Sequence, residues 1–385
     1  MKTYSDINAV VAGTGFIGPV HVEALKRLGI NVIGVMGSSA AKSDAARKSL
    51  GLKKAYAIFT DILQDEAVDA VHLAVPNILH YEMAKKTLQA GKHVMCEKPL
   101  AMTSDESEEL VTIAKASGLQ AGVCYNTRFY PLNIEARNKI QQGDLGNVFS
   151  VVGNYVQDWL LYETDYNWRV MAVQGGALRA VADIGTHWMD LVSSITGLTI
   201  ESVFADLSIF HPTRKRPKGE VETFSDKTTT QIETEDVAID TEDCGSILLR
   251  FKGGAKGCLW VSQLNAGRKN QMRYEISGAK GALAWNSETP NEIWYGHRDK
   301  PNEILGRDPA IMSDLSLPYM SYPGGHHEGF SDTFKQIFKS FYDRVLDSNH
   351  AGGIMYSTFA EGHHEIKICE AILESNKTEK WVKIQ

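Results

Sequence analysis

The first third of the chain alternates short apolar runs with amphipathic stretches. Apolar residues recur at helical spacing in 16–28 and 77–90, and 103–110 combines capping Ser and Thr residues with acids of a first helical turn. The apolar runs are continuous rather than alternating, which is typical of strands buried on both faces of a parallel sheet. They cover 7–13, 31–37, 69–76, 93–99 and 120–125. This order predicts a doubly wound α/β sheet whose ligands bind beyond the carboxyl ends of its strands.

After about residue 127 the pattern changes to strand pairs joined by glycine turns. The expected strands are 147–159, 246–251, 255–264, 273–278 and 282–287, and the expected helices are 131–142, 183–196, 326–347 and 358–375. Consecutive hairpins predict an open, mostly antiparallel sheet within a second α/β domain. We therefore expect two domains, 1–126 and 127–385, the second serving substrate binding and oligomerisation.

Composition narrows the class of partner. The 385 residues are 23% charged with a net charge of −7, which argues against nucleic acid or an anionic membrane as the main partner. The five cysteines are scattered and odd in number, so we expect reduced thiols and a cytoplasmic protein. We expect neither a secretory signal nor a membrane span, because no apolar run approaches roughly 20 residues. The basic cluster Arg214, Lys215, Arg216 and Lys218 is interpreted as a solvated loop within 211–243.

The segment GTGFIG (13–18) lies between the first predicted strand and the first predicted helix. Gly13 permits a tight turn, Gly15 lets a pyrophosphate approach the backbone, and Gly18 allows the helix and strand to pack closely. Unpaired N–H groups at the helix start, around Phe16 and Ile17, are suited to phosphate. The segment predicts a Rossmann dinucleotide site.

Two further segments carry candidate chemistry. HVMCEKPLAM (93–102) ends a buried strand with Glu97 and Lys98 before a proline, although lysines at strand ends are often merely solvated. DIGTHWMDL (183–191) places Asp183, His187 and Asp190 at i, i+4 and i+7 on one helical face. That stripe is either a helix-surface ion pair or the lining of a cleft in which His or Lys takes a hydroxyl proton and a carboxylate orients the imidazole. No metal site is expected, because no HExxH-like ligand spacing is present.

Together these segments resemble the glucose–fructose oxidoreductase / inositol dehydrogenase / rhizopine catabolism (Gfo/Idh/MocA) family. The order GTGFIG, CEKPLA, DIGTHWMDL carries the resemblance, with AVPNILH (74–80), NWR (167–169) and YPGGHHEGF (322–330) extending it over nearly the whole chain. It implies a Rossmann domain followed by an open-faced α/β domain whose sheet often forms a dimer contact. It also implies NAD(P)-dependent oxidation or reduction of a sugar, cyclic polyol or related diol.

The resemblance also assigns residues. Lys98 would sit between nicotinamide and substrate with a cis proline peptide after it, and Asp183 and His187 would complete the catalytic group, His187 being the proton acceptor. The expected cofactor-lining residues are Pro76, Asn77, His80, Glu97, Lys98, Trp168 and Arg169. Asn126 and Arg128 follow the last Rossmann strand and are expected to face the cofactor and the substrate, respectively; an exposed linker is the alternative for both. Tyr155, Asp158 and, by the resemblance alone, His326 are further candidates for the substrate, beside Lys98, Asp183 and His187.

The sequence favours NADP over NAD. NAD sites usually carry Asp or Glu at the end of the second strand, yet Gly37 stands there, followed by Ser38, Ser39 and Lys42. The serines and the lysine suit a 2′-phosphate, although NAD bound through the serines is the alternative. The family also includes a sugar-responsive regulator, so a cofactor-binding regulator is one alternative to a dehydrogenase, and a cofactor-recycling, redox-assisted glycosidase is another. A homodimer or homotetramer through the C-terminal sheet is expected.

Overall fold

The computed structural model describes residues 2–218 and 233–385, which form two compact units. The first unit comprises residues 1–126 and 330–366, and the second comprises 127–329 and 367–385. Neither unit is continuous in sequence, because the chain returns to the first unit for α9 (Phe330–Leu346) and the start of α10 (Phe359–Thr378).

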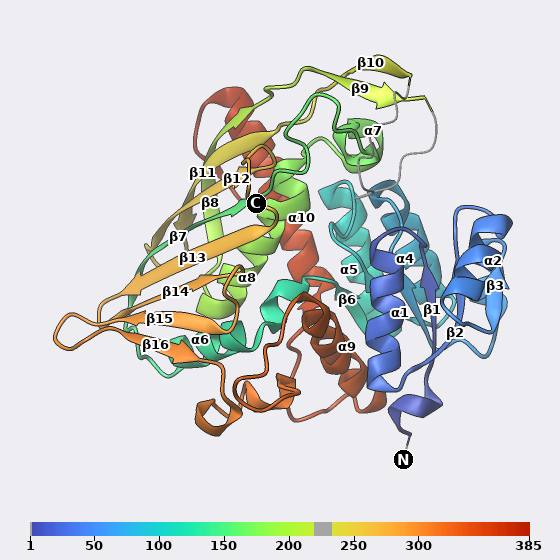
Figure 1. Cartoon of the computed structure of the whole chain (residues 1–385), viewed down its shortest axis with the longest axis horizontal. Helices are drawn as coiled ribbons and strands as arrows, with labels where there is room; N and C mark the ends of the chain where they lie inside the picture. Colours follow the sequence, from blue (N-terminus) through green and yellow to red (C-terminus); the bar gives the residue numbers. More distant parts are fainter. Residues whose placement is uncertain (1, 219–232) are drawn as a thin grey trace. The chain divides into compact units, whose positions relative to one another are not determined.

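The first unit is built on a seven-stranded sheet of order β17-β6-β5-β4-β1-β2-β3 (Figure 1). All neighbouring strands are parallel except β17, which pairs antiparallel with β6. Its strands are β1 (Asn8–Ala12), β2 (Asn31–Met36), β3 (Lys54–Tyr56), β4 (Ala70–Leu73), β5 (His93–Cys96), β6 (Ala121–Val123) and β17 (Ser357–Thr358). Besides α9 and the start of α10, its helices are α1 (Ile17–Leu28), α2 (Ala40–Ser49), α3 (Phe59–Gln64), α4 (His80–Gln89) and α5 (Ser104–Ser117), with short turns η1 (Tyr4–Asp6), η2 (Asn77–Leu79) and η3 (Asn126–Phe129), the last crossing into the second unit.

The predicted elements of this unit are confirmed. Central strands β1 and β4 are fully buried along almost their whole length, as their continuous apolar runs require. Helix α5 begins after Thr103, whose side chain accepts a hydrogen bond from the Glu106 N–H, so the expected cap is present.

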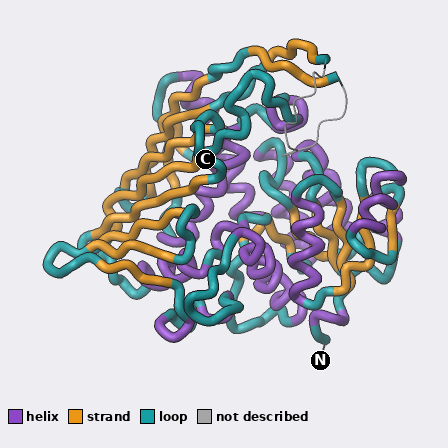
Figure 2. The backbone as a smooth tube through the Cα atoms, viewed as in Figure 1, coloured by secondary structure: helices purple, strands orange, loops and turns teal. Residues whose placement is uncertain are grey.

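The second unit contains a nine-stranded sheet of order β16-β15-β14-β13-β7-β12-β11-β8-β18, a broad layer of strands in Figure 2. Its strands are β7 (Val148–Val156), β8 (Ile200–Ser208), β11 (Cys244–Phe251), β12 (Lys256–Ser262), β13 (Gln271–Gly278), β14 (Ala282–Asn286), β15 (Glu292–Gly296), β16 (Glu303–Gly306) and β18 (Val382–Lys383). Its helical elements are α6 (Pro131–Gln141), η4 (Trp168–Val170), α7 (Ala172–Gly175), η5 (Val181–Gly185), α8 (Thr186–Thr196), η6 (Pro309–Ile311), η7 (Leu317–Tyr319) and the end of α10. The main core lies where α6, α8 and α10 pack against one face of this sheet.

One pairing departs from the hairpin pattern. Strand β7 pairs antiparallel with β13 but parallel with β12, so the carboxyl ends of β7 and β12 lie at the same edge of the sheet. A parallel neighbour needs a long connection, and here residues 157–255 separate the two strands. This pairing brings distant polar residues together, as described below.

The expected solvated basic loop is wrong for Arg214. Residues of β9 (Thr213–Pro217) pair with β10 (Thr234–Ala238), and Lys215, Arg216 and Lys218 form exposed ion pairs across this hairpin. Arg214 instead is fully buried and pairs with Asp243, which also binds Arg179. Arg214 is buried because its guanidinium is enclosed by hydrogen-bonding partners: it donates to the carbonyl oxygens of Tyr162 and Asp165 and pairs with the Asp243 carboxylate. Residues 219–232 of the predicted loop lie outside the described residues.

Candidate active site

The glycine turn after β1 has the geometry that the GTGFIG segment predicts. Gly13 has φ +116°, and a Cβ there would lie 2.0 Å from the Ala74 carbonyl oxygen. A Cβ at Gly18 would lie 2.1 Å from the Gly13 carbonyl oxygen, so α1 meets β1 too closely for any side chain. Gly15 has open space on its Cβ side, and Phe16 beside it is half-exposed. The turn therefore offers bare backbone at the start of α1, where a phosphate is favoured.

The turn after β2 holds Ser38, Ser39 and Lys42, which are all exposed. The Ser39 side chain caps α2 by accepting from the Lys42 N–H at 3.2 Å. Gly37 is buried, and a Cβ there would lie 2.9 Å from Thr14 Oγ1 and 3.0 Å from Lys42 Cβ. Lack of space therefore favours glycine at the position where NAD sites carry a carboxylate.

The loop after β4 is tied to the end of β5. Pro76 and Asn77 open the short η2 turn, and His80 begins α4. His80 is fully buried, with Nδ1 2.6 Å from the Pro99 carbonyl oxygen and Nε2 2.9 Å from that of Val75. Burial lowers the pKa of His80. His80 thus links the two loops that the resemblance assigns to the cofactor.

Glu97 and Lys98 directly follow β5, and the Lys98–Pro99 peptide bond is cis. Lys98 is half-buried, whereas Glu97 is buried and accepts a hydrogen bond from His21 Nε2 at 3.0 Å. Burial alone would raise the pKa of Glu97, but the hydrogen bond from His21 and the charge of Lys98 lower it to about 2. Asn126 ends this unit's first segment, is buried, and donates to Thr333 Oγ1 at 2.7 Å.

In the second unit the DIGTHWMDL segment is not one regular helix. Asp183 lies in η5, a π-helical turn that leads into α8, and His187 lies in the first turn of α8. Asp183 Oδ2 accepts from Gln263 Nε2 at 3.0 Å, and its Oδ1 lies 3.4 Å from Arg169 Nε. The His187 ring is buried, 6.2 Å from the ring of Tyr155. π-Helical turns often mark functional sites, because they re-aim side chains within a helix.

Polar side chains at or just beyond the ends of three strands, β7, β12 and β13, gather beside these two residues. Tyr155 hydroxyl donates to Asn270 Oδ1 at 2.8 Å, and Gln157 Nε2 donates to the same oxygen at 2.7 Å. Gln263 is fully buried, with Nε2 3.5 Å from Gln157 Oε1. Burial raises the pKa of Tyr155, so its phenol stays protonated. The group therefore consists of neutral donors and acceptors around one carboxylate and one imidazole, which suits a polyhydroxylated ligand.

Other predicted site residues of this unit have partners of their own. The Arg169 guanidinium stacks on Trp168, 4.4 Å from the ring centroid. Arg128 forms a bidentate pair with Asp190, at 2.7 and 2.5 Å, and both are buried. Asp158 lies just after β7 and accepts from the Gly267 N–H and from Lys269 Nζ. His326 is exposed on a turn and hydrogen-bonded to the Gly324 carbonyl oxygen. Asp190 is therefore the ion-pair partner of Arg128 and does not join Asp183 and His187 in the one polar face that the sequence predicts.

Comparison with known proteins agrees with this geometry. Residues 7–125 match the model of an oxidoreductase family with an NAD-binding Rossmann fold, and residues 137–384 match the C-terminal alpha/beta domain of the same family. The chain belongs to the Gfo/Idh/MocA oxidoreductase family. It is therefore a nicotinamide-dependent dehydrogenase or reductase that acts on CH–OH groups.

Relatives of known activity match most or nearly all of the chain. A levoglucosan dehydrogenase of Pseudarthrobacter phenanthrenivorans is 27% identical over 98% of both chains. The scyllo-inositol 2-dehydrogenase (NADP⁺) of Bacillus subtilis is 24% identical over 84% of this chain and 81% of its own. A solved levoglucosan dehydrogenase in complex with NADH and L-sorbose superposes with a TM-score of 0.88 at 26% identity, covering 98% and 99% of the two chains.

For this Gfo/Idh/MocA protein, reasoning from the sequence missed Gln157, Gln263 and Asn270. A signal existed, since Gln157 and Gln263 each follow a strand by one residue. These positions indicate that Gln157 and Gln263 are neighbours only once β7 and β12 are known to be parallel, because parallel strands end at the same edge of the sheet.

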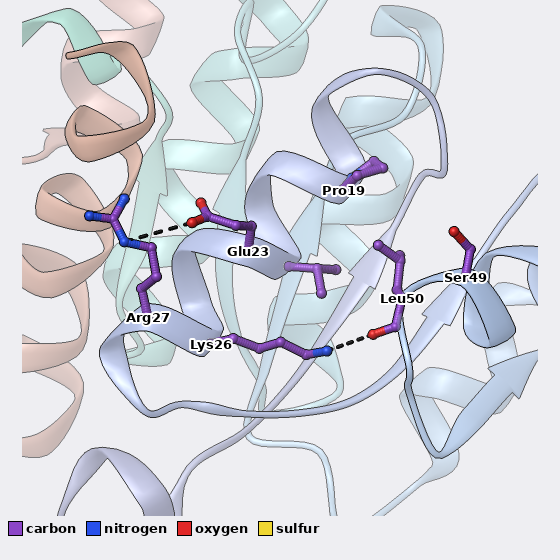
Figure 3. A pocket seen from close by; sticks show the side chains of 7 residues that line it. Pro19, Glu23, Lys26, Arg27, Ser49 and Leu50 are labelled. Atoms are coloured by element: carbon purple, nitrogen blue, oxygen red, sulfur yellow. Dashed lines mark hydrogen bonds and ion pairs between the residues drawn. The ribbon is translucent and has the colours of Figure 1, made fainter.

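A surface hollow of about 480 Å³ beside α1 is not part of this site (Figure 3). Its polar side chains are engaged locally: Lys26 Nζ donates to the Leu50 carbonyl oxygen at 2.6 Å, and Arg27 pairs with Glu23 and Asp332. It lacks the convergent polar groups of a binding site, so we assign it no ligand. Within the described residues, no helix is both long enough and apolar enough to cross a membrane.

Proposed function

We propose that the protein transfers hydride between a nicotinamide cofactor and a secondary hydroxyl or ketone of a sugar or cyclic polyol. The observation that carries this proposal is the group around Asp183 and His187, where a carboxylate held by two donors lies beside an imidazole and a set of neutral hydrogen-bonding side chains. The levoglucosan and scyllo-inositol enzymes among the relatives act on substrates of this class.

The first unit fits a dinucleotide on structural grounds. Any side chain at Gly13 or Gly18 would collide with backbone, while the Cβ side of Gly15 is open, which is the arrangement that a pyrophosphate needs. Phe16, Ile17 and the turn at Ser38 would border the dinucleotide, with Pro76, Asn77, His80, Glu97 and Asn126 beyond them. Trp168 and Arg169 are proposed to border it as well. The bound nicotinamide supplies or accepts the hydride.

The remaining chemistry is proton transfer, which falls to the side chains. We assign proton exchange with the reacting hydroxyl to His187, because an imidazole titrates near neutral pH. Asp183 orients this imidazole and the substrate, and Lys98 stabilises the developing charge on the reacting oxygen. Tyr155, Asp158, Arg128 and His326 remain proposed contacts of the substrate's other hydroxyls.

The direct test is a screen of sugars, inositols and anhydrosugars with NAD and NADP, following the absorbance of the reduced nicotinamide. A net change in absorbance with one carbohydrate supports the dehydrogenase. Product formed without net change would indicate a cofactor-recycling glycosidase. Cofactor binding without any product would indicate a regulator.

We further propose a preference for NADP, supported by Ser38, Ser39 and Lys42 on the exposed turn after β2. Gly37→Asp is a poor test of this turn because of the short contacts around Gly37, so Ser38→Asp is the better variant. Its carboxylate would repel a 2′-phosphate and bind the ribose diol instead. We expect the unmodified enzyme to show a higher kcat/KM with NADP and Ser38→Asp to reverse that order. An unmodified enzyme that prefers NAD by about tenfold or more contradicts the proposal.

A further inference from the structure

Four buried polar side chains of the first unit form a continuous row of hydrogen bonds that ends at Glu97. Tyr342 hydroxyl in α9 lies 2.8 Å from His72 Nε2 in β4, and His72 Nδ1 lies 3.1 Å from His21 Nδ1 in α1. His21 Nε2 then lies 3.0 Å from Glu97 Oε1. Tyr342, His72 and His21 are fully buried, and they come from three separate elements. None of the three was a candidate from the sequence.

The acceptor at the end of the row fixes the direction of the first bond, and a neutral His21 then fixes the direction of the other two. The Glu97 carboxylate only accepts, so His21 Nε2 must carry a proton. In a neutral imidazole the other nitrogen is then an acceptor, so His21 Nδ1 accepts from His72 Nδ1–H. His72 Nε2 in turn accepts from the Tyr342 hydroxyl. A single arrangement of protons satisfies all three bonds while both histidines stay neutral.

The surroundings favour this neutral arrangement. Burial lowers the pKa of His72 well below its usual value, so His72 is not a cation. A doubly protonated His21 would reverse two of the bonds and make the Tyr342 hydroxyl an acceptor, leaving its own proton in an apolar site. Rings of Phe338 and Phe341 pack edge-on against His72, and Tyr342 stacks on it at 5.8 Å. Charge in such a site is costly.

We propose that Tyr342, His72 and His21 form a directed hydrogen-bond chain that orients the Glu97 carboxylate beside Lys98, and that they are positioning residues for the cofactor side of the active site. The inference rests on the proposed function only in the role given to Glu97 and Lys98. Its physical basis is that an orienting donor works best when its own tautomer is fixed, as with a histidine held by a third group. Tyr342 is that group here, acting through His72.

The experiment follows the Glu97 carboxyl directly by ¹³C NMR in the cofactor-free protein, with the signal assigned through Glu97→Gln. Tyr342→Phe removes one hydroxyl and keeps the ring, and His21→Leu removes the direct donor. Tyr356→Phe is the matched control, because Tyr356 is also a buried tyrosine of this unit but donates to Gln120. The other titratable groups near Glu97 are Lys98, His80, Cys96 and Cys124, and none of them is altered.

We expect unmodified Glu97 to remain ionised well below pH 4.5, the ordinary glutamate value. In His21→Leu its midpoint should rise above that value, because burial then dominates, and in Tyr342→Phe it should rise by a smaller amount. Both variants should weaken binding of the reduced cofactor at least about threefold, the loss of one modest hydrogen bond. His21→Gln, whose amide donates without a tautomer, should restore much of the Glu97 titration. The control should change neither quantity.

Two results would overturn the proposal. One is a Glu97 midpoint that is the same in the unmodified protein, Tyr342→Phe and His21→Leu. The other is a stoichiometric metal ion in the purified protein, since the ligand atoms of His21, Glu97 and Cys124 lie within 4.8 Å of one another and an ion there would replace the hydrogen bond. Because the titration needs neither substrate nor turnover, failure of the proposed function would leave this result intact.

Discussion

At the scale of single residues, one hydrogen bond and one ion pair hold the candidate catalytic carboxylate. Gln263 approaches Asp183 Oδ2 and Arg169 approaches Oδ1, so both oxygens face a donor. Gln263 is fully buried and lies one residue beyond β12, where its backbone N–H donates to the Asp243 carbonyl oxygen at 3.0 Å. A carboxylate fixed in this way orients a neighbouring imidazole better than a rotating one does.

We predict that Gln263→Leu lowers kcat/KM about tenfold or more. A hydrogen bond to a charged group is worth about 1.5–3 kcal/mol, and about 1.4 kcal/mol corresponds to a factor of ten. Gln271→Leu is the matched control, because Gln271 is also buried but donates to Glu288. Steady-state kinetics and thermal unfolding of both variants check the prediction. Equal kinetic losses in the two variants would assign Gln263 a general packing role.

Residues whose role depends on local backbone geometry could be predicted from the sequence more easily than residues whose role depends on a contact with a distant residue. Gly13 and Gly18 were predictable, because their function depends on local turn geometry that a short segment encodes. Gln263 and His21 were not, because each acts on a residue about eighty positions away in the sequence. Arg214 shows the same limit, since a buried ion pair and a solvated basic loop have the same local composition.

At the scale of elements, the strands and helices were largely predictable and their irregularities were not. Continuous apolar runs identified β1, β2, β4, β5 and β6. The π-helical turn η5 could not be predicted, because the spacing of Asp183, His187 and Asp190 in the sequence fits a regular α-helix. The turn explains why Asp183 meets Gln263 while Asp190 meets Arg128.

The Arg128–Asp190 pair gives α8 a buried attachment to the segment before α6, and we predict that it is needed for stability. Asp190→Ala should lower the free energy of unfolding by about 3–5 kcal/mol, because it leaves a buried guanidinium without its carboxylate. The double variant Arg128→Met, Asp190→Leu should recover most of this loss, since no buried charge then remains. Chemical denaturation measures both values.

The same double variant tests the predicted substrate contact of Arg128. An unchanged KM for the substrate in this double variant would show that Arg128 stabilises the fold and does not contact the substrate. A KM raised about tenfold in a stable double variant would support contact with the substrate.

At the scale of the whole molecule, the outer face of the nine-stranded sheet carries several exposed apolar side chains. Its exposed residues include Phe149, Val152, Leu248, Trp260 and Ile304. Apolar patches of this kind on a regular surface mark interaction sites. We propose that a second copy of the chain covers this face, consistent with the expected homodimer or homotetramer.

We predict that Val152→Lys shifts the protein towards the monomer. The register places Val152 opposite Glu275, so a lysine there gains a cross-strand partner and the fold of the single chain is preserved. Ile58→Lys, on an exposed site of the first unit, is the control. Light scattering coupled to size-exclusion chromatography measures the molar mass of the unmodified protein and of both variants. An unmodified protein that is already monomeric, or a Val152→Lys protein of unchanged mass, contradicts the proposed interface.

The sequence also carried no signal for the return of 330–366 to the first unit. Helix α9 has an amphipathic pattern, but such a pattern says only that one face is buried and not against what. The buried hydrogen-bond row from Tyr342 to Glu97 depends on that return, so it could be found only in the structure.

The central claim, proposed above, is that Lys98, Asp183 and His187 are the catalytic residues of a carbohydrate dehydrogenase. The most direct measurement is the turnover of Lys98→Ala on the best substrate of the screen, beside cofactor affinity measured by fluorescence. We predict a loss in kcat of at least about 10²-fold, the lower range for removing a group that stabilises a developing oxyanion, with the cofactor Kd within a few-fold of the unmodified value. Lys86→Ala, which removes an exposed lysine of the same unit, should keep full activity, and His187→Ala should resemble Lys98→Ala. Near-normal turnover in a folded Lys98→Ala protein would contradict the account.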